Sequence, residues 1–137
     1  FHIGVFQGYE FAWVREKHPN LKPLAVGVNG IRYASACLMV SARSPAREFA
    51  DLQGKTLAVP SGCHNWPRLY IDRQVDAVGK KSEAFFRAIP APANVEECLD
   101  DVIDGKLNAA VIDEPAGEAF RRSKPGRSTK LRERGRP

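Results

Sequence analysis

The sequence is poor in cysteine, with Cys37, Cys63 and Cys98 spread far apart in 137 residues. None of them belongs to a C-x-x-C motif, and none stands at a zinc-ligand spacing from the three histidines. An odd number of cysteines also leaves at least one thiol free. We therefore expect neither a disulfide framework nor a metal site, and nothing in the sequence implies a cofactor.

Long apolar runs are also missing. No run approaches the roughly 20 residues that a membrane-spanning helix needs. The basic and then apolar segments of a secretion signal are likewise not found at the start of the chain. Because Phe1 leads directly into a strand-like segment, we expect the chain to begin inside a longer reading frame.

Positive charge is scarce outside the C-terminal end. The formal charge is +5, but eight of the 21 basic residues and only one of the 16 acidic residues lie in residues 121–137. Residues 1–120 therefore hold 13 basic and 15 acidic residues. Such a body lacks the excess charge that binds phosphate backbones, so we expect no nucleic-acid partner. The basic end itself could be a site for nucleic acid or acidic lipid, or it could be a solvated or disordered end.

Apolar strand-like runs alternate with amphipathic segments along the chain, in which 43% of residues are hydrophobic. The pattern predicts strands at residues 2–6, 24–28, 33–40, 56–59, 84–89 and 109–112. It predicts helices at residues 10–17, from Ser44-Pro45, at 68–75, at 95–103 with Asn94 as N-cap, and at 116–120. This alternation is typical of an α/β fold with a mostly parallel sheet and helices on both faces.

The turns that follow the strands are the candidate sites, because open parallel sheets bind ligands beyond the carboxyl ends of their strands. Four turns carry polar groups, at residues 6–9, 60–64, 90–94 and 113–114. The turn at 60–64 precedes a helix, whose unpaired N–H groups could cradle an anion. Alternatively, Ser61 only caps that helix and Gly62 only makes the turn.

Two further candidates have alternatives of their own. Cys63-His64 could form a nucleophile and its base, although adjacent residues on a helix rarely face each other and no orienting carboxylate is evident. Asp113 could accept hydrogen bonds from a ligand's hydroxyl, amine or protonated phosphonate oxygen. It could instead cap the next helix, with Pro115 in the first turn. Tyr9, Trp13 and Tyr33 could line a pocket or simply pack in a core or on the surface.

Four segments together resemble the substrate-binding proteins of phosphate/phosphite/phosphonate-type ABC transporters. They are GVFQGYEFAW from residue 4, RYASACLMVSARSP from 32, DLQGKTLAVPSG from 51 and DGKLNAAVIDE from 104. The resemblance covers roughly residues 3–132. Its D-L-x-G-K and D-G-x-x-x-A-x-x-x-D patterns are typical of type 2 periplasmic binding proteins in general.

The resemblance implies a two-lobed protein that closes on its ligand by a hinge, of which this chain holds an incomplete part. Residues 1–36 would be the later part of lobe one, and residues 37–124 most of lobe two. Residues 125–137 would be a basic tail that starts the return to lobe one, with a return strand from Lys130. The crossover would lie in or near residues 33–40.

The resemblance also implies individual roles. Tyr33 matches a ligand-contacting tyrosine, Ser61 falls in an anion-binding loop, and Asp113 matches an acidic residue that helps select an amine or a protonated ligand. Two departures stand out. Residues 60–63 read Pro-Ser-Gly-Cys where phosphonate binders carry Ser-Thr-Ser-Gly, and Asn94-Val95 stands where they carry a histidine.

The function implied is the non-catalytic, solute-binding component of an ABC importer, with its permease as partner. It would bind a small oxyanion-bearing solute, similar to phosphate, phosphite or phosphonate, in a cleft between the lobes. We expect a monomer, periplasmic or anchored on the outer side of the membrane in the full-length parent. The alternatives are a ligand-sensing domain of the same fold in a regulator or membrane sensor kinase, and an enzyme that uses Cys63. The candidate ligand-binding residues are Gln7, Tyr9, Tyr33, Ser61, Gly62, Cys63, His64, Asn94 and Asp113.

Overall fold

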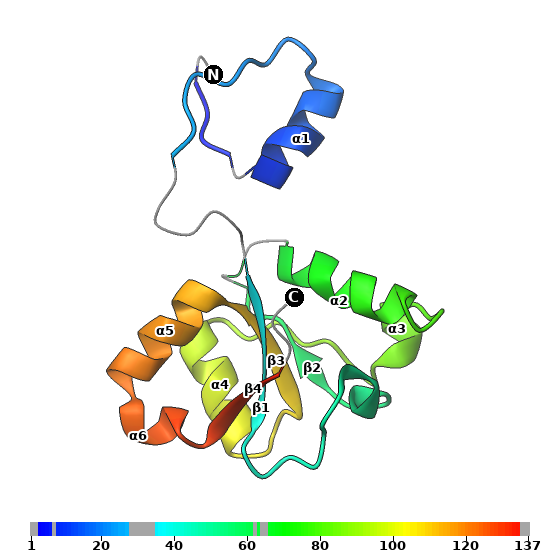
Figure 1. The fold of residues 1–137 in the computed structure, drawn as a ribbon, viewed down its shortest axis with the longest axis vertical. Helices are drawn as coiled ribbons and strands as arrows, with labels where there is room; N and C mark the ends of the chain where they lie inside the picture. Colours follow the sequence, from blue (N-terminus) through cyan, green and yellow to red (C-terminus); the bar gives the residue numbers. More distant parts are fainter. Residues whose placement is uncertain (1–2, 7, 28–34, 62, 64–65, 135–137) are drawn as a thin grey trace. The chain divides into compact units, whose positions relative to one another are not determined.

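The computed structural model describes residues 3–6, 8–27, 35–61, 63 and 66–134 (Figure 1). The chain divides into two compact units, Phe1–Arg32 and Tyr33–Pro137, and each is considered by itself. The assignment of residues 1–36, 37–124 and 125–137 to two lobes and a returning tail stays a prediction.

The first unit contains one described element, the helix α1 (Gly8–Lys17). Glu10 lies in its first turn, with Arg15 and Lys17 in its last, as the helix dipole favours. The sequence prediction of strands at residues 2–6 and 24–28 is wrong for the parts described, since residues 3–6 and 21–27 form no strand. An apolar alternation makes a strand only when a neighbouring strand completes its hydrogen bonds, and the described residues of this unit supply none.

The second unit is built on a four-stranded sheet in the order β2-β3-β1-β4. Its strands are β1 (Ala36–Ser41), β2 (Leu57–Ala58), β3 (Ala109–Asp113) and β4 (Leu131–Arg134). Only β2 and β3 pair in parallel, whereas β1 is antiparallel to both β3 and β4. The α/β class is confirmed, but the sheet is mixed instead of mostly parallel. A continuous apolar run indicates that a strand is buried on both faces, as β1 and β3 are. It does not indicate the direction of the strand.

Helices cover both faces of this sheet, as predicted. One apolar cluster joins Leu38 and Val40 of β1 to Ile71 and Val75, and the other joins Met39 of the same strand to neighbours on the opposite face. Figure 1 shows α2 and α3 on one side of the sheet and α4 and α5 on the other. The elements are the 3-10 helix η1 (Phe49–Leu52), α2 (Trp66–Asp76), α3 (Ser82–Phe85), α4 (Val95–Ile103), α5 (Glu114–Ser123) and α6 (Pro125–Ser128).

Two predicted elements around η1 and α3 are wrong. The helix expected from Ser44-Pro45 begins only at Phe49, because the Asp51 carboxylate accepts hydrogen bonds from the N–H groups of residues 47 and 48 and fixes the turn there. The strand expected at residues 84–89 is mostly replaced by α3. Its phenylalanines pack in the core, with Phe85 stacked on Phe49 at 5.6 Å between ring centroids, so their apolar pattern reflects packing. Only Ala88 forms a single parallel bridge, to Thr56.

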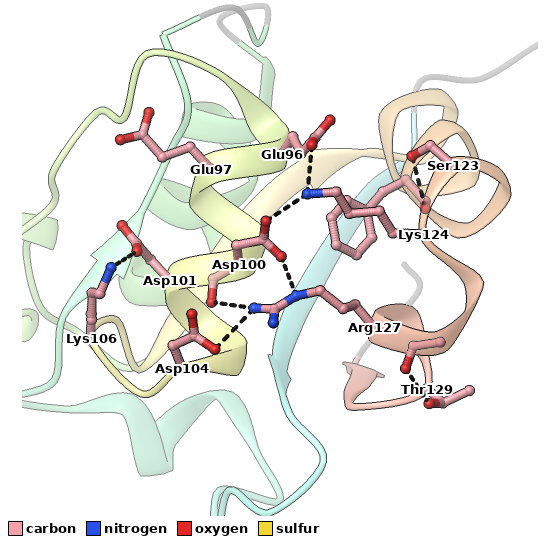
Figure 2. A network of polar contacts seen from close by, with 12 residues as sticks. Glu96, Glu97, Asp100, Asp101, Asp104, Lys106, Ser123, Lys124, Arg127 and Thr129 are labelled. Atoms are coloured by element: carbon pink, nitrogen blue, oxygen red, sulfur yellow. Dashed lines mark hydrogen bonds and ion pairs between the residues drawn. The ribbon is translucent and has the colours of Figure 1, made fainter.

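The basic C-terminal segment is folded through Arg134, so the interpretation as a disordered end is wrong for these residues, although many of their side chains are exposed to solvent. It forms the end of α5, then α6 and β4, so a strand does begin near Lys130 as predicted. Figure 2 shows how two of its cations bind the acidic face of α4. Lys124 Nζ lies 2.8 Å from Asp100 Oδ2, and Arg127 Nη2 lies 2.9 Å from Asp104 Oδ1. Arg127 Nε also donates to Asp100. The positive charge of the tail is therefore partly neutralised within the fold.

We expect this ion-pair network to make stability depend on pH through Asp100. Hydrogen bonds from Lys124 and then Arg127 hold the pKa of the Asp100 carboxyl below its usual range. A lowered pKa in the folded state stabilises the protein above the unfolded pKa of about 3.9, and this contribution is lost as the pH falls through the folded value. Because these side chains are partly exposed, solvent weakens each pair and its contribution to stability is small.

Urea unfolding at pH 7 and near pH 2.5 measures this contribution. Asp100→Asn should be less stable than the unmodified chain at pH 7, and the difference should be smaller at the acidic pH. The control is Asp76→Asn, since the described residues give Asp76 no ion pair. An equal loss for Asp100→Asn at both pH values would contradict the electrostatic account.

Candidate ligand-binding site

Three of the four predicted turns meet at one edge of the sheet. The parallel register pairs Leu57 with Ala109 and Ala58 with Ala110, so the segments after β2 and β3 leave the sheet side by side. The backbone N–H of Ser61 donates to Pro92 O at 2.9 Å, which brings the turn at residues 90–94 to the same place. The fourth turn, at residues 6–9, belongs to the other unit.

Ser61 lies at this edge but does not cap a helix. Its Oγ donates to Ala91 O at 3.0 Å, and α2 begins only at Trp66. The interpretation of Ser61 as a helix cap is therefore wrong. Because its hydroxyl proton is already donated within the protein, the Ser61 oxygen can only accept a hydrogen bond from a ligand.

Asn94 performs the predicted capping role at the neighbouring turn. Its side-chain Oδ1 accepts a hydrogen bond from the N–H of Glu97 at 2.8 Å, at the start of α4. The residue is exposed, and its amide nitrogen donates to none of the described residues. Asn94 therefore keeps its two amide hydrogens available to a bound molecule.

Asp113 ends β3 and starts α5. Its Oδ1 accepts a hydrogen bond from the N–H of Ala116 at 2.8 Å, and Pro115 lies in the first turn, which confirms the capping interpretation. The side chain is half-buried, and no described residue donates to its second oxygen, Oδ2. One carboxylate oxygen therefore maintains the helix start while the other can accept a hydrogen bond from a ligand.

Cys63 lies next to Asp113 and is half-buried. Burial raises the pKa of the Cys63 thiol, a backbone hydrogen bond from Asp113 lowers it, and the Asp113 carboxylate raises it further. The net shift is upward, so the side chain is a neutral thiol at neutral pH. A nucleophilic cysteine needs the opposite shift, so burial and the neighbouring carboxylate disfavour Cys63 as a nucleophile.

We expect slow alkylation of Cys63 as the measurable consequence. Peptide mass spectrometry after timed iodoacetamide treatment should show a rate that rises only above the pH at which a free small-molecule thiol ionises. The unfolded chain in urea is the control, and its Cys63 should react like an ordinary thiol. Half-maximal reactivity below pH 8 in the folded protein would restore the nucleophile hypothesis.

The other predicted site residues are not shown to lie at this edge. Tyr9 lies within α1 of the first unit. The remaining candidates, Gln7, Tyr33, Gly62 and His64, fall outside the described residues. The site that the structure brings together therefore consists of Ser61, Cys63, Asn94 and Asp113.

A cavity of about 650 Å³ runs along α4, but its chemistry does not suit an anion. Among the described residues, its lining consists mainly of carboxylates, such as Glu97 and Asp101, together with Asn94 and the cation Lys106. Within the described ranges, no group of three or more metal-ligating side chains is arranged to hold an ion. No helix in the part of the chain that the structure describes is both long and apolar enough to cross a membrane.

Sequence reasoning missed one residue near this edge, Arg134 at the end of β4. It lies in the strand expected from Lys130, but neither the Leu-Arg-Glu-Arg pattern nor the family resemblance marks it as a ligand-binding residue. The pairing of Leu38 with Arg134 places it within the sheet.

The chain matches one protein family, described as ABC transporter, phosphonate, periplasmic substrate-binding protein, over residues 1–133. No curated protein matches it. Among solved structures it is similar to a binding protein component of an ABC phosphonate transporter from Pseudomonas aeruginosa, with a TM-score of 0.62 and 14% identity. That match covers 78% of this chain and 37% of the other.

Two further similar structures are described as binding proteins for other solutes. A putative periplasmic sulfonate-binding protein from Methylobacillus flagellatus has a TM-score of 0.56 and 16% identity, covering 73% of this chain and 27% of that one. An arginine transport binding protein from Legionella pneumophila has a TM-score of 0.54 and 16% identity, covering 74% and 42%. The chain thus spans less than half the length of each. At these identities the likeness shows the fold, which is the type 2 periplasmic-binding-protein fold implied by the sequence motifs.

Proposed function

Because the chain belongs to the family of phosphonate-type periplasmic substrate-binding proteins of ABC transporters, we propose that it forms part of the solute-binding component of an importer. The solute is a small molecule that bears an oxyanion, of the phosphate, phosphite or phosphonate kind. It is bound and released without chemical change.

The observation that carries this proposal is the meeting of three polar turns at the carboxyl edge of β2 and β3. Asn94 offers amide hydrogens there, and Asp113 offers one free carboxylate oxygen. This combination fits a solute that both accepts and donates hydrogen bonds, such as a partly protonated or amine-bearing oxyanion. The neutral Cys63 thiol adds no negative charge that would repel it.

The rest of the proposal concerns the protein as a whole. Residues 1–36 and 37–124 belong to two lobes, and the solute binds in the cleft between them. Gln7, Tyr9 and Tyr33 contact it from lobe one, and Gly62 and His64 complete the loop from lobe two. The protein is monomeric and meets its permease in the periplasm or on the outer side of the membrane.

Calorimetric titration of the full-length protein with a panel of solutes tests the function. The panel is inorganic phosphate, phosphite, methylphosphonate, an aminoalkylphosphonate, methanesulfonate and sulfate, with arginine as the amino-acid comparison. We expect saturable, one-to-one binding of at least one phosphorus or sulfur oxyanion. Binding of arginine alone, or of none of these solutes, would contradict the proposed solute class.

A further inference from the structure

The strand β4 presents two arginines on one face of the sheet. Arg134 lies opposite Leu38 and Arg132 opposite Val40, and residues directly opposite each other in an antiparallel pair share a face. Leu38 and Val40 belong to the first apolar cluster. The two guanidinium groups therefore extend from the edge strand along the face that α2 and α3 cover.

The two arginines differ in what they bind. Arg132 Nη2 donates to the backbone oxygens of Ser44 and Ala46, at 3.0 and 2.9 Å, and so holds the loop after β1. The Nε atoms of both arginines are buried and have no hydrogen-bond partner among the described residues, but the half-buried Arg134, unlike Arg132, also has no such partner at its Nη atoms. None of the described carboxylates forms an ion pair with Arg134.

A partly buried guanidinium with an unpaired N–H is costly, because it has lost hydration without gaining a partner. A buried polar group without a partner calls for an explanation, and a bound molecule that completes its hydrogen bonds is one such explanation. Guanidinium has a planar set of donors that matches the oxygens of phosphate, phosphonate, sulfonate or carboxylate groups two at a time.

The position of Arg134 connects it to the candidate site. Since β1 is antiparallel to both β3 and β4, these two strands run in the same direction, and their carboxyl ends lie at the same edge. Asp113 ends β3 there, opposite Ala36, and Arg134 ends β4, opposite Leu38. From strand geometry their backbones are separated by about 10 Å across the sheet and about 7 Å along it. The Asp113 and Arg134 backbones are therefore far enough apart for a small solute to lie between the side chains.

We propose that Arg134 is the residue that binds the oxyanion of the solute at the carboxyl edge of the sheet. The inference rests on the proposed function and names the charged group of that site. Arg134 would also replace hydrogen-bond donors that the loop at residues 60–63 lacks, since the Ser61 hydroxyl already donates to Ala91 O. The positive charge comes from the return strand in place of the loop hydroxyls.

Calorimetry on the full-length protein tests Arg134 with methylphosphonate, inorganic phosphate and methanesulfonate as probes. Arg134→Gln should bind about 10- to 150-fold more weakly, the range for a lost charge-assisted hydrogen bond. Arg134→Lys should lose less, because it keeps the charge without the planar fork. The matched control is Arg122→Gln on α5, which removes the same charge from an exposed side chain and should stay within twofold.

The outcomes distinguish a failure of the proposed function from a failure of the role proposed for Arg134. If the unmodified protein binds none of the probes, the proposed function and this inference both fail. If it binds and Arg134→Gln binds within threefold of it, this inference alone fails. If Arg134→Gln does not fold by circular dichroism, Arg134→Lys decides, since affinity equal to that of the unmodified protein would show that no guanidinium contact exists.

Discussion

Replacing Asp113 with asparagine should weaken solute binding about 10- to 150-fold while changing the free energy of unfolding by less than about 0.5 kcal/mol. The Asp113 side chain has two tasks on its two oxygens. Oδ1 caps α5 by accepting from Ala116, and Oδ2 is available to the solute. Asparagine is as good an N-cap as aspartate, but it has no charge with which to hold an amine or a protonated oxygen. Calorimetry with an aminoalkylphosphonate and urea unfolding measure the two tasks separately.

Asp113→Ala provides the comparison for this experiment. It removes the cap as well as the charge, so it should lose about 0.5 to 2 kcal/mol of stability in addition to the affinity. If Asp113→Asn binds the aminoalkylphosphonate as tightly as the unmodified protein, the carboxylate is only a helix cap. In that case Asp113 would leave the candidate site.

Replacing Leu99 with alanine should lower the free energy of unfolding by about 2 to 5 kcal/mol. Leu99 on α4 is fully buried in the apolar cluster that includes Met39 and Ile112, so its removal leaves a cavity under the helix. Because α4 also holds the ion-pair network and follows the turn at Asn94, its packing positions one side of the candidate site. Urea unfolding followed by circular dichroism gives the value.

Leu69→Ala is the matched control for Leu99. The same substitution is made in the helix α2, where Leu69 is 45% exposed, and it should cost less than about 1 kcal/mol. Similar losses at the two positions would contradict the packing of α4 against the sheet.

Local signals in the sequence predicted the second unit better than the first. The caps at Asn94 and Asp113 and the helical spacing of α4 are set by neighbouring residues, and the structure confirms them. Strand direction and strand pairing depend on distant partners. For this reason the sheet proved mixed, and the apolar alternations at 3–6 and 24–27 formed no strands among the described residues.

The candidate site was predictable as far as it follows from strand ends. The rule that ligands bind beyond the carboxyl ends of parallel strands placed Ser61, Cys63, Asn94 and Asp113 in separate turns, and pairing of β2 with β3 brings these turns together. The same rule does not predict which hydrogen bonds each side chain makes. The bond that the Ser61 hydroxyl donates to Ala91 O is an example. Arg134 was missed because a strand predicted from Lys130 does not show which strand it pairs with, and so does not place Arg134 in the same sheet as Asp113.

The central claim is that a small oxyanion-bearing solute binds at the carboxyl edge of this sheet. Hydrogen exchange of the full-length protein, with and without the tightest-binding solute of the panel, tests it most directly. The account predicts slower exchange in peptides that cover residues 61–63, 113–116 and 131–134, with no change at α3. Protection confined to the acidic face of α4, or no protection in the second unit at saturating solute, would contradict it.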